Sequence, residues 1–166
     1  MRPVIRFAAL VALALLATIP AGHAGTVGER ARNLTGNISA DPGEALRLIN
    51  QYRRQHGLAP LILDRTLTRA AQQHANDMAA HDMMSHQVSH GGLRQRMALA
   101  GIRPRLAAEN VSAGYRNTGR AIAGWQNSPA HNRNLLLAKV RRMGLAAAYQ
   151  PNSRYKYYWA LIVAAD

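Results

Sequence analysis

The stretch Trp125-Gln-Asn-Ser-Pro-Ala-His-Asn-Arg-Asn134 contains the end of one predicted helix and the start of the next. The first of these helices has Thr118 available as its N-cap residue. Ser128 and Pro129 then restart the helix, because Ser is a favoured N-cap residue and Pro fits the first helical position. His131 is therefore expected in the first turn of the new helix. The positive end of a helix disfavours the imidazolium ion, so we expect this imidazole to be neutral.

Glu109 is the acidic residue that most needs an explanation. It lies in residues 107–113, which read as a short inner strand, and the whole chain has eight acidic residues. Most of the others are helix caps or lie near the chain ends. An unpaired charge on an inner strand costs roughly several kcal/mol, so Glu109 needs a histidine or a cation as partner. Met84-Ser85-His86 supplies one such histidine. Two imidazoles and a carboxylate, brought together, are a minimal set for binding a divalent metal or moving a proton.

The other predicted elements surround these motifs. Asp41, Pro42 and Glu44 form a helix start with the elements of a capping box, and Asp64 caps the next helix. That next helix has an apolar stripe on one face, with its members three or four positions apart (Leu67, Ala71, Ala75, Met78). The expected helices are 41–56, 64–81, 92–101, 118–127 and a further turn from 128, and the expected strands are 107–113 and the antiparallel hairpin 142–150 with 155–164. Helices before and after the strands would cover both faces of the sheet. The predicted fold class is therefore α+β, a three-layer α-β-α sandwich with a small, mainly antiparallel sheet.

The first 24 residues read as an export signal. Arg2 and Arg6 precede an apolar run, and Gly22-His23-Ala24 is a small-x-small cleavage site. The apolar run is too short to span a membrane. We therefore divide the chain into a signal peptide at 1–24, a flexible lead-in at 25–40 and one domain at 41–166. This organisation predicts a secreted or periplasmic protein with no transmembrane segment after cleavage.

Composition limits the chemistry and the partners. The 166-residue chain has no cysteine, which excludes disulfides, thiolate zinc sites and cysteine nucleophiles. Its formal charge is +13, and loss of Arg2 and Arg6 with the signal would lower it to +11. Outside the cytoplasm, such a charge favours anionic envelope polymers or lipids, or it only solvates the surface. No basic stretch is interleaved with aromatic residues, so we expect no nucleic-acid partner. The oligomeric state is left open.

Several motifs in this order resemble the CAP superfamily, also called SCP-like or PR-1-like proteins, in its short bacterial extracellular form. The resemblance extends from about Ala45 to Val163. Its pieces are Leu48 to Arg53, Leu58 to Asp64, Ala70 to Met78, Ser85-His86, Ala108-Glu109-Asn110 and Trp125 to Asn134. The resemblance implies the same α-β-α sandwich. It also implies lipid or sterol binding, which some members of the family show.

The resemblance places His86, Glu109 and His131 in the central cavity of the fold, where two His and two Glu can hold a divalent ion in many members. Ser128 stands where eukaryotic members have the second Glu. The ligand cavity is thus expected to contain His86, Glu109, Ser128 and His131, with His86, His131 and Glu109 as ligands of a weakly bound metal such as zinc. The missing carboxylate also removes the paired acids that glycosidase chemistry requires.

Three interpretations of these residues remain open: a hydrogen-bonded core network, a metal or ligand site, and a catalytic centre in which Glu109, His86 and His131 act. The favoured function is an exported, non-enzymatic module of the cell envelope that binds lipid or wall polymer. The alternative is a metal-dependent hydrolase of peptide or peptidoglycan, with the two imidazoles holding the metal and Glu109 as base or third ligand.

Overall fold

A computed structural model describes residues 40–166 of the chain. The predicted signal peptide and nearly all of the lead-in lie outside the described residues. The helices are α2 (Pro42–Gln55), α3 (Arg65–Ala80), α4 (Leu93–Leu99), α5 (Thr118–Gln126) and α6 (Pro129–Leu135). The strands are β1 (Ile62–Leu63), β2 (Leu106–Ala113), β3 (Arg142–Tyr149) and β4 (Tyr157–Ala165). Each predicted helix and strand is present, and β1 is an addition.

The four strands form one sheet in the order β1-β3-β4-β2. The neighbours β3 and β4 are antiparallel, as are β4 and β2, whereas β1 runs parallel to β3 over two residue pairs. The predicted hairpin is therefore correct, and the mainly antiparallel sheet is confirmed. Strand β2 lies at one edge of the sheet, and this position matters for the site because loops from both faces can reach it.

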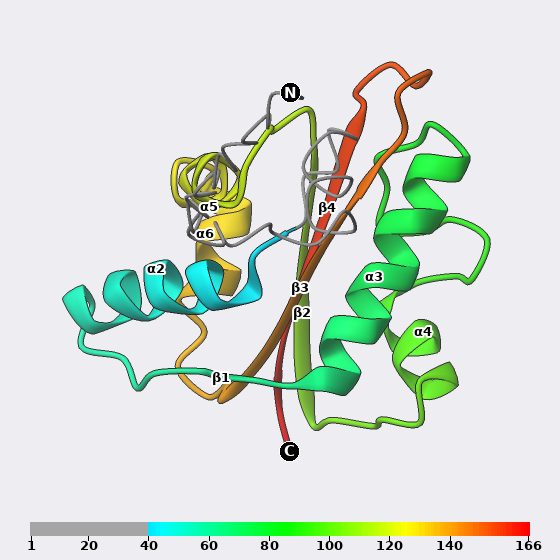
Figure 1. The fold of residues 1–166 in the computed structure, drawn as a ribbon. Coiled ribbons are helices and arrows are strands. Elements are labelled where there is room, and N and C mark those ends of the chain that lie inside the picture. The colour runs from blue at the N-terminus through cyan, green and yellow to red at the C-terminus, as the bar shows by residue number, and fades with distance from the viewer. Residues whose placement is uncertain (1–39) are drawn as a thin grey trace, which may run out of the picture. The chain divides into compact units, whose positions relative to one another are not determined.

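Helices cover both faces of the sheet, as Figure 1 shows: α2, α5 and α6 lie on one side and α3 and α4 on the other. Helix α3 packs along β3 and β4, and α4 contacts both α3 and β2. On the opposite side, α5 contacts α2 and α6, and α6 also contacts β2. The fold is thus the expected α-β-α sandwich.

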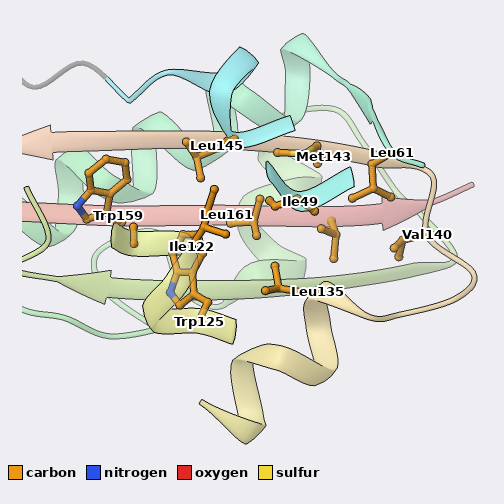
Figure 2. Packing of buried hydrophobic residues seen from close by; sticks show 13 residues of the cluster. Ile49, Leu61, Ile122, Trp125, Leu135, Val140, Met143, Leu145, Trp159 and Leu161 are labelled. Carbon is orange, nitrogen blue, oxygen red and sulfur yellow. The ribbon is translucent and has the colours of Figure 1, made fainter. Parts of the chain in front are cut away.

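Strand β4 is buried on both faces, which explains its continuous apolar sequence. Trp159 and Leu161 pack with the side chains under α2, α5 and α6, and this cluster is drawn in Figure 2. The alternate residues Ala160 and Ile162 pack against α3 on the other face. This alternation follows from the two-residue period of a strand. The stripe predicted on α3, which includes Leu67 and three further residues, is buried here as expected (Leu67, Ala71, Ala75, Met78).

The predicted helix caps are correct for α2 and α3 and wrong for α5. Asp41 and Asp64 accept hydrogen bonds from backbone N–H groups of the first turns of α2 and α3, as predicted. Thr118 is not the cap of α5: Asn117 takes that role and accepts from the backbone N–H of Arg120. Thr118 is buried, and its hydroxyl accepts the backbone N–H of Asp41 at 3.1 Å. The hydroxyl therefore links α5 to α2, and the backbone N–H that a capping box would give to Glu44 goes to Thr118 instead.

Candidate functional site

Glu109 has both of the partner types that its buried position required. Its side chain is only 2% exposed, on β2, and faces the layer formed by α3 and α4. Arg96 of α4, itself 3% exposed, donates from Nη2 to both carboxylate oxygens at 2.9 Å. The Nδ1 atom of His86 lies 2.9 Å from Oε2 of the same carboxylate. The prediction that a cation or a histidine pairs with Glu109 is confirmed, and both do so.

His86 is oriented by this carboxylate. A carboxylate only accepts hydrogen bonds, so Nδ1 carries the proton and Nε2 is left without a partner among the described residues. The side chain is 57% exposed, so Nε2 is available to a ligand. The hydrogen bond to Glu109 raises the pKa of His86 above its ordinary value, and burial opposes this rise only in part. His86 therefore becomes protonated more readily than a free histidine.

His74 belongs to the same network, although no role was predicted for it from the sequence. It is fully buried in α3, and its Nε2 lies 2.9 Å from the carbonyl of Ser85 and 3.8 Å from Oε2 of Glu109. Burial lowers the pKa of His74, although the negative charge of Glu109 acts in the opposite direction. A neutral His74 thus fixes the residue that precedes His86. In the sequence, His74 borders the apolar stripe of α3 and falls within one motif of the resemblance, Ala70 to Met78.

The loop that carries His86 has a second anchor at Asp77. Ser89 donates to Asp77 from both its backbone N–H and its hydroxyl, at 2.9 and 2.7 Å, and Nδ1 of His90 lies 3.3 Å from the carboxylate. Burial alone would raise the pKa of Asp77, but these hydrogen bonds together lower it. Asp77 therefore remains an anion that ties residues 89–90 to α3.

His131 lies in the first turn of α6, as predicted. Ser128 occupies the N-cap position, but its side chain accepts no capping hydrogen bond from a backbone N–H of α6; its hydroxyl lies 2.9 Å from Nδ1 of His131 instead. Burial lowers the pKa of His131, and the charge of His86 lowers it further. The expected direction is correct, whereas the main cause is burial.

Asn110 holds α6 against the other face of β2. Its side chain donates to the carbonyl of His131 at 3.1 Å and accepts from Asn134 at 2.9 Å. Asn134 also donates to the backbone carbonyl of Glu109 at 3.1 Å. Neighbouring strand residues point to opposite faces, so Glu109 and Asn110 place the two histidines from opposite sides of β2. Both asparagines fall within the motifs singled out from the sequence, but neither was assigned a function.

The two histidines share a cavity of about 350 Å³ beside β2. Ser128 also lines it, together with Met84, Val111, Trp125 and other residues. Of the four residues predicted for the cavity, three line it, and Glu109 lies behind His86 without reaching the wall. No carboxylate of residues 40–166 lines this cavity.

The predicted three-ligand metal set does not match this arrangement. Both oxygens of Glu109 are engaged by Arg96, and one of them also by His86. Within residues 40–166, no three His, Asp or Glu side chains are placed to hold one metal ion together. The donor set that faces the cavity is reduced to two imidazoles, with Glu109 as the group that orients one of them.

The family model of the cysteine-rich secretory proteins, CAP, matches residues 46–163, which is most of the chain. The chain belongs to the CAP family. Its membership does not depend on cysteines, because the chain has none. As a CAP protein it carries the sandwich fold that the motifs implied.

Known proteins and solved structures are similar to this chain over most of the described part. The YkwD protein of Bacillus subtilis is 29% identical over 110 residues, which cover 66% of this chain and 43% of YkwD. The structure of an extracellular SCP-domain protein from Bacillus anthracis matches with a TM-score of 0.68 and 25% identity, over 85% of this chain and 44% of that one. An outer surface protein of Borrelia burgdorferi matches with a TM-score of 0.66 and 19% identity, over 76% of this chain and 96% of that one. The chain spans less than half the length of the Bacillus proteins. Within residues 40–166, no helix is long and apolar enough to cross a membrane.

Proposed function

We propose that this CAP protein is an exported, non-enzymatic module that binds a ligand of the cell envelope, a lipid or a wall polymer, in the cleft beside His86 and His131. The observation that carries the proposal is the composition of the cleft wall. It presents imidazoles and the hydroxyl-bearing residue Ser128 beside apolar side chains, and no carboxylate of residues 40–166 lines it. Ligand sites typically combine an apolar wall with a few fixed polar groups.

The state of Glu109 supports binding over hydrolysis. A general base needs a carboxylate that is free to reach the substrate or its water. Glu109 is buried, paired with Arg96 and hydrogen-bonded to His86, so its contribution is to orient an imidazole.

Export is supported by the sequence and by similar proteins. The first 24 residues have the order of an export signal. A similar Bacillus anthracis protein is described as extracellular, and a protein of the same fold from Borrelia burgdorferi as an outer surface protein. The basic charge of the chain favours anionic targets, and exposed charges are screened beyond about 8 Å at physiological ionic strength. Binding driven by this charge should therefore weaken as salt is added.

Co-sedimentation of the secreted protein with purified wall fragments and with anionic vesicles tests this function. We expect binding to one of these targets, weakened when His86 or His131 is replaced by Ala and unchanged by His56→Ala, an exposed substitution at the end of α2. Equal binding by all three variants would mean that the cleft beside His86 and His131 does not bind the target. Release of soluble fragments from the wall by the wild type, but not by the His86 variant, would make the protein a hydrolase and overturn the non-enzymatic function.

We also propose that the two imidazoles hold zinc weakly, with Glu109 behind His86. Affinity should fall as the pH is lowered, because a ligating imidazole must be unprotonated and the pKa of His86 is raised. Zinc should raise the melting temperature of the wild type but not of His86→Ala or His131→Ala, measured by scanning fluorimetry. An unchanged melting temperature of the wild type at millimolar zinc would refute the zinc site, without contradicting the proposed ligand binding in the cleft.

A further inference from the structure

A second cavity, of about 590 Å³, lies between α4 and the segment that leads into β2. Its apolar lining comes from Leu93 and Met97 of α4 and from Ile102 and Ala107 beyond it. Met97 is only 2% exposed and the other three are half-buried, so these four side chains are recessed, whereas the small side chain of Ala98, which also lines the cavity, is exposed. The cavity shares no residue with the histidine cleft.

Three arginines line the same cavity: Arg94, Arg103 and Arg105. All three are exposed, and within residues 40–166 none of them makes an ion pair or a side-chain hydrogen bond. Buried Arg96, in the same helix as Arg94, by contrast pairs with Glu109 and donates to backbone carbonyls. No acidic residue of the described chain lines the cavity, so three positive charges converge on it without a counter-charge.

Pro104 lies between two of the arginines and also lines the cavity. Its ring fixes its own backbone angle and restricts the preceding residue to an extended conformation. The segment that carries Arg103 and Arg105 therefore loses less conformational freedom on binding than an ordinary loop would. A guanidinium is also well suited to a carboxylate or a phosphate, because its donors match two oxygens at once.

We propose that this groove binds a single-chain anionic amphiphile, with its acidic head on the three arginines and its alkyl chain along the apolar floor. Charge complementarity selects the head, and the recessed apolar lining selects the chain. A volume of about 590 Å³ is within the range of small-molecule sites, roughly 300–1,000 Å³. The site is independent of the histidine cleft and does not require the function proposed for that cleft.

A single molecule fits the groove better than a membrane surface does. Docking on a bilayer needs apolar side chains that project outward, whereas the apolar lining here lies below the charges. Leu99, 66% exposed on α4, is the projecting apolar residue nearby, and it does not line the cavity. Leu99→Ser therefore separates the two modes: it should leave the binding of a free amphiphile unchanged and should weaken docking on a membrane.

Titration of the secreted protein with oleate, monitored by displacement of a dansylated fatty acid, tests the groove. Oleamide, which has the same chain without the charge, should bind at least about tenfold more weakly, the effect of about one charge-assisted hydrogen bond. Affinity should also rise with chain length from octanoate upward, by up to about fourfold for each buried methylene.

The variants decide the location. The triple change Arg94→Gln, Arg103→Gln and Arg105→Gln should weaken oleate binding by at least about tenfold. The charge-matched triple change Arg47→Gln, Arg54→Gln and Arg120→Gln, at exposed positions of α2 and α5, should not. Equal losses in both would mean that net charge alone attracts oleate, and would overturn the site. If His131→Ala loses oleate binding while the Arg94, Arg103 and Arg105 triple variant keeps it, the amphiphile binds in the histidine cleft, and this outcome would also overturn the proposed groove. Binding of anionic vesicles but not of free oleate, abolished by Leu99→Ser, would identify a membrane-docking surface instead.

Discussion

Removing one partner of the Arg96–Glu109 pair should be among the most destabilising single changes in this protein. The two side chains are 3% and 2% exposed, and both carboxylate oxygens lie 2.9 Å from the same guanidinium nitrogen. Arg96→Met leaves the Glu109 anion buried with only His86 and His74 beside it. Glu109→Gln leaves the Arg96 cation buried among backbone carbonyls. Breaking a buried pair in this way costs about 3–5 kcal/mol of unfolding free energy.

The double variant should recover much of this loss. A buried ion pair is costly to desolvate, and replacing both partners by neutral residues of similar volume is often close to neutral. We therefore expect the combined change Arg96→Met and Glu109→Gln to cost less than the sum of the single changes, by about 2–3 kcal/mol, the upper part of the range of about 0.5–3 kcal/mol found for contacting residues. The coupling distinguishes a mutually dependent pair from two residues that stabilise the fold separately.

Urea unfolding measures the free energy of unfolding of each variant. It can be followed by the fluorescence of the two buried tryptophans, Trp125 and Trp159. With a slope of about 2 kcal/mol per molar urea, each single variant should lower the midpoint by about 2 M. Arg120→Met, an exposed change on α5, is the matched control and should shift the midpoint little. Two outcomes would refute a coupled ion pair at the base of the site. One is a loss of less than about 1 kcal/mol in each single variant, the range of an exposed ion pair. The other is a loss in the double variant equal to the sum of the two single losses.

Further predictions concern titration and packing. The hydrogen bond from His86 to Glu109 raises the pKa of His86. This bond therefore stabilises the fold fully below pH 6.5, and the stabilisation is lost as the pH rises through the raised pKa. NMR titration of the Glu109→Gln variant should show a lower pKa for His86 than in the wild type. Burial lowers the pKa of His131, so stability should fall as the pH drops from 6.5 through the lowered value, and His131→Gln should flatten this part of the stability curve measured by urea titration. Gly144→Ala would place a Cβ 2.2 Å from the backbone of α3 and should lower the free energy of unfolding by at least about 1–3 kcal/mol, measured by thermal unfolding. The control Gly119→Ala would place a Cβ no closer than 3.6 Å to another atom and should leave stability unchanged or raise it. Unchanged stability of the first glycine variant would mean that α3 can move away from the sheet.

The sequence predicted the elements well wherever the signal was local. The caps Asp41 and Asp64, the stripe of α3 and the two hairpin strands depend on neighbouring residues, so periodicity and capping chemistry were sufficient. Strand β1 was missed because two residues are too few to show a period. Thr118 was assigned as a cap because its type suits one, but its hydroxyl serves a backbone N–H 77 positions away, and no local pattern reports such a contact.

The sequence by itself determined that Glu109 needs a positive partner, that His131 opens a helix and that the chain has a CAP-like order of motifs. It could not determine which groups meet. Arg96 reads as one of many arginines, and His74 as the border of an apolar stripe, until α3 and α4 pack on the same face of the sheet and enclose the same carboxylate. The tertiary structure decided that Glu109 orients His86 from behind instead of lining the cavity. The physical reason is burial: once the carboxylate is out of water, it is stabilised by whichever cation and hydrogen-bond donor the fold brings to it, and only the packing of the layers determines which these are.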